Sequence, residues 1–507
     1  MRTTCKVVIS AFFCIGLLAC AEHPPVQAND KMSDIALREL SAVDASALIR
    51  ARQITATRLV QAVVANAKRY AHLNAYITFD EEGALREAAS IDASILAGTA
   101  SGRLLGVPLI IKDNIEVAGM PITIGTPAMK GIVPKRHAAV VQLLVDEGAI
   151  ILGKANLHEL AFGVTSNNKH FGAVRNPYHQ DFFAGGSSGG TAAALASRGA
   201  TAGLGSDTGG SVRIPAALSG VCGLRPSSGR YPQSGVVPIS GTRDVVGPMA
   251  RTVADLILLD AVIMQHEPDF QAAESSTIRL GVPRRYFFAN LEPGVAELID
   301  QNLERIAGAG IRLIEVDIEI PADIEAEIGF ALVIHEMREL FPAYLQASTA
   351  GQVVYSDLVR DIASADVKEI FETLIDNPET VPNEEYRRVK EIALPEFQAV
   401  YRDYFAEHKL DAMIFPTTPL TAKRIQAIKD TIELNGETFS TFKTLSRNTA
   451  PGSVAGVPGI TLPIGLSTED GLPVGIAIGG PVGSDDRLLS IALALEKILT
   501  SMPSPEQ

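Results

Sequence analysis

Apolar residues recur at three- and four-residue spacing along the first part of the chain. They do so between residues 34 and 70, and the Ala-rich stretch 82–97 also contains no helix breaker other than one glycine. This spacing places the apolar side chains on one face of a helix. The pattern therefore predicts helices over both stretches, with Ser41 and Asp44 as candidate helix starts.

Short apolar runs alternate with helical stretches after residue 100. Residues 104–111 and 150–152 form two such runs, with a helical pattern at 140–147 between them, and residues 410–420 and 457–479 return to strand character with Pro and Gly turns. Continuous apolar runs bounded by turn residues are typical of strands buried on both faces. The alternation predicts an α/β fold with a large, mostly buried sheet.

Residues 285–400 have a different character, more charged and more helical than the rest. We interpret this stretch as a helical insert, because apolar strand patterns continue on both sides of it. A length of 507 residues alone would favour two or three domains. The continuity of the strand pattern instead predicts one domain over residues 34–500.

The N-terminus has the pattern of an export signal. An apolar run at 7–18 is too short to span a membrane, and Leu17-Leu18-Ala19-Cys20 resembles a bacterial lipobox. We predict that residues 1–19 are a signal peptide and that Cys20 is lipidated. Cleavage of residues 1–28 with plain secretion, and an uncleaved membrane anchor, are the alternatives. The expected location is the periplasm, free or as a membrane-anchored lipoprotein.

Composition excludes collagen-like, disordered and coiled-coil proteins, and charge disfavours nucleic-acid binding. Apolar residues make up 47% of the chain and charged residues 20%, which is ordinary globular composition. Lys and Arg number 44 against 58 Asp and Glu, so the net charge is −14, and loss of Arg2 and Lys6 with the signal would make it −16. We therefore expect no nucleic-acid partner. Of four cysteines, three lie in the first twenty residues, which leaves Cys222 as a lone thiol.

Glycine-rich turns gather between residues 184 and 224, on both sides of an Ala-rich helical stretch. A phosphate-binding loop is disfavoured, because neither a GxxxxGK[ST] nor a GxGxxG pattern is present. A nucleophile elbow at Ser188 would need a histidine, for which His335 and His408 are the weak candidates. His158 and His335 each precede a glutamate without a second histidine at helical spacing, so we predict no metal site and regard both as structural or pocket-lining.

A third interpretation of the glycine-rich turns is a serine nucleophile with a lysine as general base. Lys112 ends the apolar run at 104–111, where burial would favour its neutral amine, a general base. Ser187 lies in a glycine-flanked turn and can relay a proton. Ser211 follows Thr208-Gly209-Gly210, a turn whose backbone N–H groups could converge on an oxyanion. The sequence thus offers nucleophile, relay, base and anion site without a histidine.

These motifs resemble the amidase signature family. The resemblance rests on the run from Gly185 to Pro226, on LIIKDN around Lys112, and on FPTTP and GVPGITLPIG in the C-terminal part. It extends over about residues 34–500. It implies an α/β amidase signature fold, in which a large mixed central sheet is covered by helices on both faces.

The resemblance also implies the roles of individual residues. Lys112, Ser187 and Ser211 would form a Ser–cis-Ser–Lys triad, with Ser211 as the acylated nucleophile, Ser187 as the bridging serine and Lys112 as the base. The oxyanion hole would comprise the backbone N–H groups of Thr208, Gly209, Gly210 and Ser211. No metal or organic cofactor would be needed.

Neighbouring residues receive supporting roles. Asp207 and Arg213 are expected to support the loop, and Ser188 to hydrogen-bond within its own turn. Ser206 and Ser219 stand where the family commonly has Thr and Cys. Neither is expected to touch the triad.

The sequence defines the substrate class less closely than it defines the candidate catalytic residues. Residues 229–251 look most like the branch with indoleacetamide and mandelamide hydrolases, so we expect an aryl or arylalkyl amide that is hydrolysed to acid and ammonia or amine. An exported peptide amidase is the alternative, and a catalytically idle amidase-fold binding protein is the alternative of a different class. Residues 331–345 and 440–455 are expected to line the substrate entrance. A homodimer is the default expectation for quaternary structure.

Overall fold

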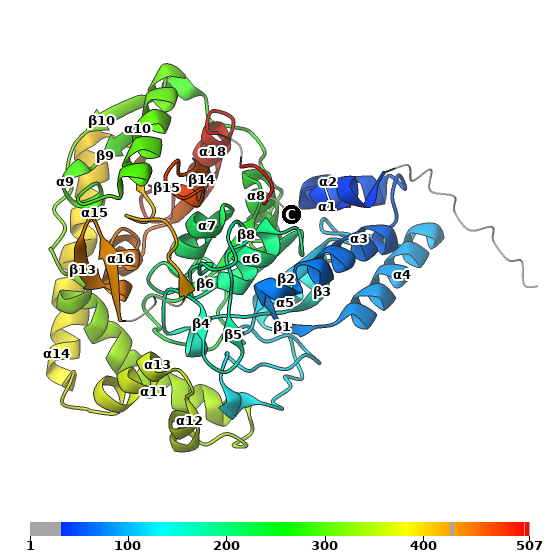
Figure 1. Cartoon of the computed structure of the whole chain (residues 1–507), viewed down its shortest axis with the longest axis horizontal. Helices are drawn as coiled ribbons and strands as arrows, with labels where there is room; N and C mark the ends of the chain where they lie inside the picture. The colour runs from blue at the N-terminus through cyan, green and yellow to red at the C-terminus, as the bar shows by residue number, and fades with distance from the viewer. Residues whose placement is uncertain (1–31, 426–429, 501, 506–507) are drawn as a thin grey trace, which may run out of the picture.

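The computed structural model describes residues 32–425, 430–500 and 502–505. Its centre is an eleven-stranded sheet (Figure 1). The expected α/β fold with a large mixed central sheet is confirmed. In spatial order the strands are β1 (Tyr76–Phe79), β3 (Ile150–Ala155), β2 (Pro108–Lys112), β6 (Ala202–Asp207), β8 (Val245–Ala250), β7 (Cys222–Arg225), β14 (Gly459–Leu466), β15 (Pro473–Gly479), β11 (Ala412–Pro416), β9 (Arg279–Val282) and β10 (Arg312–Glu315).

Strand direction explains where functional residues can meet. β3, β2 and β6 run parallel to one another, as do β11, β9 and β10, whereas the strands from β6 through β8, β7, β14 and β15 to β11 pair antiparallel. Parallel neighbours end at the same edge of a sheet. The last residues of β2 and β6, Lys112 and Asp207, therefore come to the same edge.

Two small hairpins lie outside the central sheet. β4 (Asn167–Asn168) pairs with β5 (Gly172–Ala173), and β12 (Thr431–Leu434) pairs with β13 (Glu437–Ser440). β12 and β13 are joined by Asn435-Gly436, both with positive φ, which suits a tight hairpin turn.

The first helices form where the periodic pattern predicts them. Ser41 caps the second helix by accepting the backbone N–H of Asp44 at 3.0 Å, so Ser41 is the start and Asp44 lies inside the helix. None of the helices within the described ranges is long and apolar enough to cross a membrane. The α-helices of the N-terminal half are α1 (Asp34–Glu39), α2 (Ala42–Arg50), α3 (Ala56–Arg69), α4 (Glu81–Ala97), α5 (Ala139–Asp146), α6 (Gly189–Ala196), α7 (Arg213–Ser219) and α8 (Val253–Ile263).

The C-terminal half supplies the remaining α-helices. In chain order these α-helices are α9 (Arg284–Phe287), α10 (Pro293–Gly308), α11 (Phe330–Ser348), α12 (Tyr355–Asp361), α13 (Ala365–Ile370), α14 (Asn383–Arg388), α15 (Leu394–His408), α16 (Thr441–Ser446), α17 (Ala450–Ala455) and α18 (Asp485–Glu496). The helices α11 to α14 gather at the lower left of Figure 1, away from α1 to α4 on the right.

The Ala-rich helix predicted between the glycine-rich turns is α6, and it is buried along its whole length. It contacts β2, β3, β6 and β8. A Cβ on Gly190 would lie only 2.3 Å from the backbone oxygen of Asn156 and 2.4 Å from that of Ala75. Small residues therefore let the start of α6 approach the sheet closely, which fixes the preceding turn with Ser187.

The stretch 285–400 differs from the expected helical insert in its first part. β10 pairs parallel with β9 at the edge of the central sheet, and α10 buries Val295, Ile299 and Leu303 against the main core. The charged, four-residue β10 was hidden because its pattern is too short to distinguish from a loop. The separate helical layer therefore begins only at Glu325, where a π-helical turn, Glu325–Gly329, leads into α11.

The predicted signal segments 1–19 and 1–28, and Cys20 with its predicted lipid, lie outside the described residues.

Candidate active site

Lys112 and Ser187 meet at the buried end of β2. Lys112 Nζ lies 2.8 Å from Ser187 Oγ and donates a hydrogen bond to it, and both side chains are fully buried. The peptide bond between Gly186 and Ser187 is cis. Lys112 Nζ also donates to Ser206 Oγ at 2.8 Å, and Asn114 Nδ2 donates to the same oxygen at 3.0 Å. The expectation that Ser206 does not touch the triad is therefore wrong, because Ser206 projects from β6, the parallel neighbour of β2.

Burial changes the protonation of Lys112. It lowers the pKa of the amine from 10.5 to about 7, although the negative charges of Asp207 and Asp244 oppose the shift. Among the residues that the structure describes, no carboxylate contacts Lys112 directly, and its two closest partners are hydroxyls. A substantial share of the lysine is thus neutral near pH 7 and able to accept a proton.

Ser211 lies next to the turn that carries Ser187. Its backbone oxygen accepts the N–H of Ser188 at 3.1 Å, which ties the two glycine-rich turns together. Ser211 is partly exposed and lines a cavity, unlike the buried Ser187. Within the part of the chain that the structure describes, its hydroxyl makes no hydrogen bond. From the cavity inward the structure thus places Ser211 and then Ser187 and Lys112, and the hydrogen bond among these three side chains joins Lys112 to Ser187.

One member of the predicted oxyanion hole has another partner. The N–H of Gly210 donates to Asp207 Oδ1 at 2.8 Å, so we correct this assignment and place Gly210 in the support of the loop. Gly210 has φ +137°, and a Cβ there would lie 2.1 Å from Thr449 Oγ1. The backbone N–H groups of Thr208, Gly209 and Ser211 have no acceptor among residues 32–425, 430–500 and 502–505. These three groups remain free to bind an oxyanion.

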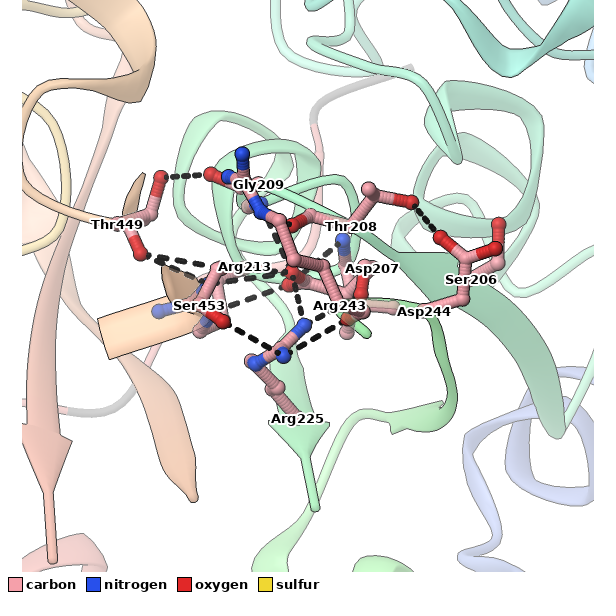
Figure 2. A network of polar contacts seen from close by, with 12 residues as sticks. Ser206, Asp207, Thr208, Gly209, Arg213, Arg225, Arg243, Asp244, Thr449 and Ser453 are labelled. Carbon is pink, nitrogen blue, oxygen red and sulfur yellow. Dashed lines mark hydrogen bonds and ion pairs between the residues drawn. The ribbon is translucent and has the colours of Figure 1, made fainter. Parts of the chain in front are cut away.

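Asp207 is the centre of the network that supports this loop (Figure 2). Its carboxylate accepts from Arg213 Nε at 3.0 Å and from Arg225 Nη1 at 3.1 Å, and all three side chains are nearly or fully buried. Burial alone would raise the pKa of Asp207, but the two guanidinium groups outweigh it and hold the pKa well below its usual range. Ser453 Oγ accepts from Arg213 Nη2 at 2.7 Å. The expected support by Asp207 and Arg213 is present, with Arg225 as an additional partner.

A second set of contacts fixes the outer side of the loop. Thr208 Oγ1 donates to Asp244 Oδ1 at 2.6 Å, and Thr449 Oγ1 donates to the carbonyl of Gly209 at 2.7 Å (Figure 2). Arg243 Nε donates to the carbonyl of Thr208 at 3.1 Å. In a trans peptide the N–H of the next residue points opposite to the carbonyl, so these contacts fix the directions of the Gly209 N–H and of the Gly210 N–H, the latter of which Asp207 accepts.

Arg243 also joins the loop to the helical layer. Its Nη1 and Nη2 donate to the two carboxylate oxygens of Glu325 at 2.9 and 2.6 Å, and both side chains are buried. Sequence reasoning missed Arg225, Arg243 and Glu325. Their chain separation carries no periodic signal, and only the fold brings them together.

The cavity beside Ser211 is largely apolar. Its empty space, including the open mouth, amounts to about 510 Å³. The residues expected at the entrance within 331–345 and 440–455 contribute Val333, Phe442 and Ser446. The remaining lining residues are Ala161, Phe162, Gly163, Val164, Thr208, Gly209, Ile239, Arg243, Glu325 and Phe330.

The histidines considered for a nucleophile elbow or a metal site lie elsewhere. His158 Nε2 lies 3.0 Å from Asp366 Oδ2 of the helical layer, His335 Nε2 lies 2.9 Å from Asn383 Oδ1 within that layer, and His408 is the last residue of α15. None of the three lines the cavity beside Ser211. Ser188 Oγ donates to the carbonyl of Ser206 at 3.3 Å, which corrects the expectation of a bond within its own turn and leaves no nucleophile elbow.

One cluster in the described residues has the composition of a metal site. It consists of Asp260, His266 and Asp486. Arg230 Nη2 already donates to Asp260 Oδ2 at 2.7 Å and to Asp486 Oδ1 at 2.6 Å. A guanidinium group therefore supplies the positive charge there.

Comparisons with known proteins identify the family of the chain. The family model described as Amidase matches residues 58–489. The chain is 40% identical to an indoleacetamide hydrolase of Agrobacterium vitis, over 90% of this chain and 97% of that protein. It is 40% identical to a mandelamide hydrolase of Pseudomonas putida, over 92% and 93%.

The fold comparison gives the same assignment. The peptide amidase structure from Stenotrophomonas maltophilia superposes with a TM-score of 0.76 at 27% identity, covering 92% of this chain and 98% of that one. The match to the family model and the two relatives at 40% identity together show that the chain belongs to the amidase family and is an amide hydrolase.

Proposed function

We propose that the protein hydrolyses the amide of an arylalkyl carboxylic acid to the acid and ammonia, with Ser211 as nucleophile. The observation that carries this proposal is the buried contact of Lys112 Nζ with Ser187 Oγ beside a serine that faces an apolar cavity. The aromatic and aliphatic walls, which include Phe162, Phe330 and Val333, favour a flat apolar acyl group. The relatives that act on indoleacetamide and mandelamide support the same substrate class.

In the proposed acylation, the neutral amine of Lys112 takes the proton of Ser187, which takes the proton of Ser211. Ser211 Oγ then attacks the amide carbon, and the N–H groups of Thr208, Gly209 and Ser211 stabilise the resulting oxyanion. The proton returns through Ser187 to the leaving nitrogen, and ammonia departs. Water attacks the acyl-enzyme by the same relay and releases the carboxylic acid.

The test compares ammonia release from a panel of amides. Indoleacetamide, mandelamide and phenylacetamide should be turned over with higher kcat/KM than acetamide or an N-capped peptide amide. Preference for the peptide amide would favour the peptide amidase alternative, and preference for acetamide would contradict the proposed acyl class.

Variants separate the nucleophile from its surroundings. Ser211→Ala should lose at least about 10³-fold in kcat and all labelling by a fluorophosphonate probe. Ser219→Ala is the matched control, since this buried serine donates only to the carbonyl of Ala184 and lies outside the site. Retention of a tenth of kcat by Ser211→Ala, or labelling at another residue, would refute the assignment.

We also propose that the protein is exported and carries a lipid on Cys20, on the strength of the apolar run at 7–18 and the lipobox-like Leu17-Leu18-Ala19-Cys20. Intact-mass measurement of the protein from a membrane fraction should give a chain that begins at Cys20 with added acyl mass. A chain that begins at Met1 would refute export, and one that begins after Ala28 would refute lipidation.

A further inference from the structure

A second cavity adjoins the one beside Ser211. Its empty space, including the open mouth, amounts to about 800 Å³, and it lies where the start of the helical layer faces the β12–β13 hairpin and α16. Glu325 and Ser446 line both cavities and form the wall that they share. The cavities are therefore neighbours, and the far end of a substrate whose amide lies at Ser211 would reach the second cavity by passing Glu325 and Ser446.

The acidic groups of the second cavity already have cationic partners. Its titratable lining residues are Tyr286, Asp323, Glu325, Lys443 and Arg447. Asp323 Oδ2 lies 2.5 Å from Lys443 Nζ, and both oxygens of Glu325 accept from Arg243. The Tyr286 hydroxyl donates to the backbone oxygen of Arg447 at 3.3 Å, and burial raises its pKa to about 12. This tyrosine is therefore a neutral phenol near pH 7.

Arg447 is the cation without a counter-charge. Its Nε donates to Asn448 Oδ1 at 3.1 Å, whereas its Nη2 is buried without an acceptor. No carboxylate forms an ion pair with it within the described parts of the chain. The side chain is only partly exposed, and burial lowers the pKa of its guanidinium. A partly buried guanidinium without an anion carries a desolvation cost that a bound anion would offset.

The backbone at Arg447 is held firmly in place. The side-chain amide of the next residue, Asn448, donates to the carbonyls of Phe287 at 2.9 Å and Pro416 at 2.7 Å. Arg447 thus follows α16 at a point anchored to two other parts of the chain. A fixed planar guanidinium is well suited to pair with a planar carboxylate.

We propose that the second cavity is a subsite for a carboxylate on the end of the substrate remote from its amide, with Arg447 as the residue that binds it. This inference rests on the proposed function, because it deepens the substrate class from arylalkyl amides to those that carry a distal carboxylate. Arg447 selects the charged substrate, and the apolar cavity beside Ser211 accepts the aromatic part.

The kinetic test compares two amides of the same length. One is the monoamide of benzene-1,4-diacetic acid, which carries a carboxylate opposite its amide, and the other is 4-isobutylphenylacetamide, which has two methyl groups in place of the two carboxylate oxygens. Arg447→Met should lower kcat/KM for the carboxylated amide by about tenfold or more, as expected for loss of a charge-assisted hydrogen bond, with little change for the neutral one. Arg402→Met is the matched control, because it removes an exposed arginine that pairs with Asp403 and lines neither cavity. It should leave the preference between the two amides nearly unchanged.

A binding measurement makes the test independent of turnover. Calorimetry on Ser211→Ala should show binding of benzene-1,4-diacetate that Arg447→Met abolishes in the same background, with inorganic phosphate binding far more weakly. Equal kinetic losses for both amides would overturn the proposal in favour of a structural role for Arg447. Tighter binding of phosphate would overturn the carboxylate assignment, and loss of dicarboxylate binding without any kinetic effect would assign the site to free carboxylates instead of substrate. If the dicarboxylate binds in this way but the wild-type protein hydrolyses none of the amides, the proposed function is refuted while the anion site is retained.

Discussion

The buried amine of Lys112 can be tested by its effect on stability. Lys112→Met removes the titrating group and keeps the length and burial of the side chain. The folded wild type releases the lysine proton at about pH 7, whereas the unfolded chain releases it at 10.5. Between these values the unfolded state binds more protons, so the stability of the wild type relative to Lys112→Met should rise with pH.

The magnitude follows from the two pKa values. A shift from 10.5 to about 7 corresponds to about 5 kcal/mol in total, or about 1.4 kcal/mol for each pH unit inside this window. Because the lysine of the folded state is half-titrated at pH 7, the stability difference should change by about 2 kcal/mol between pH 7 and 9. Below pH 7 both states hold the proton, and the difference should become constant.

Urea unfolding of wild type and variant at pH 6, 7, 8 and 9 measures this difference. Ser187→Ala keeps the amine and should follow the pH dependence of the wild type. In parallel, kcat/KM of the wild type should rise with a midpoint near pH 7, because the neutral amine is the base. A stability difference that stays constant from pH 7 to 9 would refute a depressed lysine pKa, and with it the role of Lys112 as a neutral base.

Three further results are expected. Asp207→Asn removes the negative charge shared by buried Arg213 and Arg225 and should lower the free energy of unfolding by about 3–5 kcal/mol in urea titrations; a loss typical of a surface substitution would contradict this. Val333→Trp should narrow the cavity and reduce kcat/KM for indoleacetamide more than for acetamide, whereas equal losses would speak against an acyl pocket. Cys222 is buried and its pKa is raised well above the usual value by that burial, so a disulfide reagent should label it only upon unfolding; immediate labelling of the native protein would be inconsistent with the structure.

Local patterns predicted those parts of the site that lie within continuous motifs. The glycine-rich turns around α6 and the lysine at the end of an apolar run pointed to Lys112, Ser187 and Ser211, and the structure brings them to one edge of the sheet. The contact of Ser206 with Lys112 needed the pairing of β2 with β6. A sequence read without strand order does not contain that pairing.

Other features depend on tertiary contacts alone. Arg243 and Glu325 are 82 positions apart and have no pattern that links them, yet they form a buried bidentate pair. The Gly210 N–H, in contrast, was assigned to the oxyanion hole from a local pattern and is taken by a local contact. Its turn is locally suited to bind an anion, but the carboxylate of Asp207 only three residues earlier takes that hydrogen bond.

β10, one of the two edge strands of the central sheet, has a bearing on how the protein behaves at high concentration. An edge strand presents unpaired backbone groups that can template pairing with another molecule. Both terminal residues of β10, Arg312 and Glu315, are exposed and charged, and Glu315 Oε2 pairs with Arg284 Nε at 2.9 Å. A second copy that added a strand there would have to desolvate these charges. The charged ends of β10 thus disfavour aggregation by intermolecular strand addition at this edge.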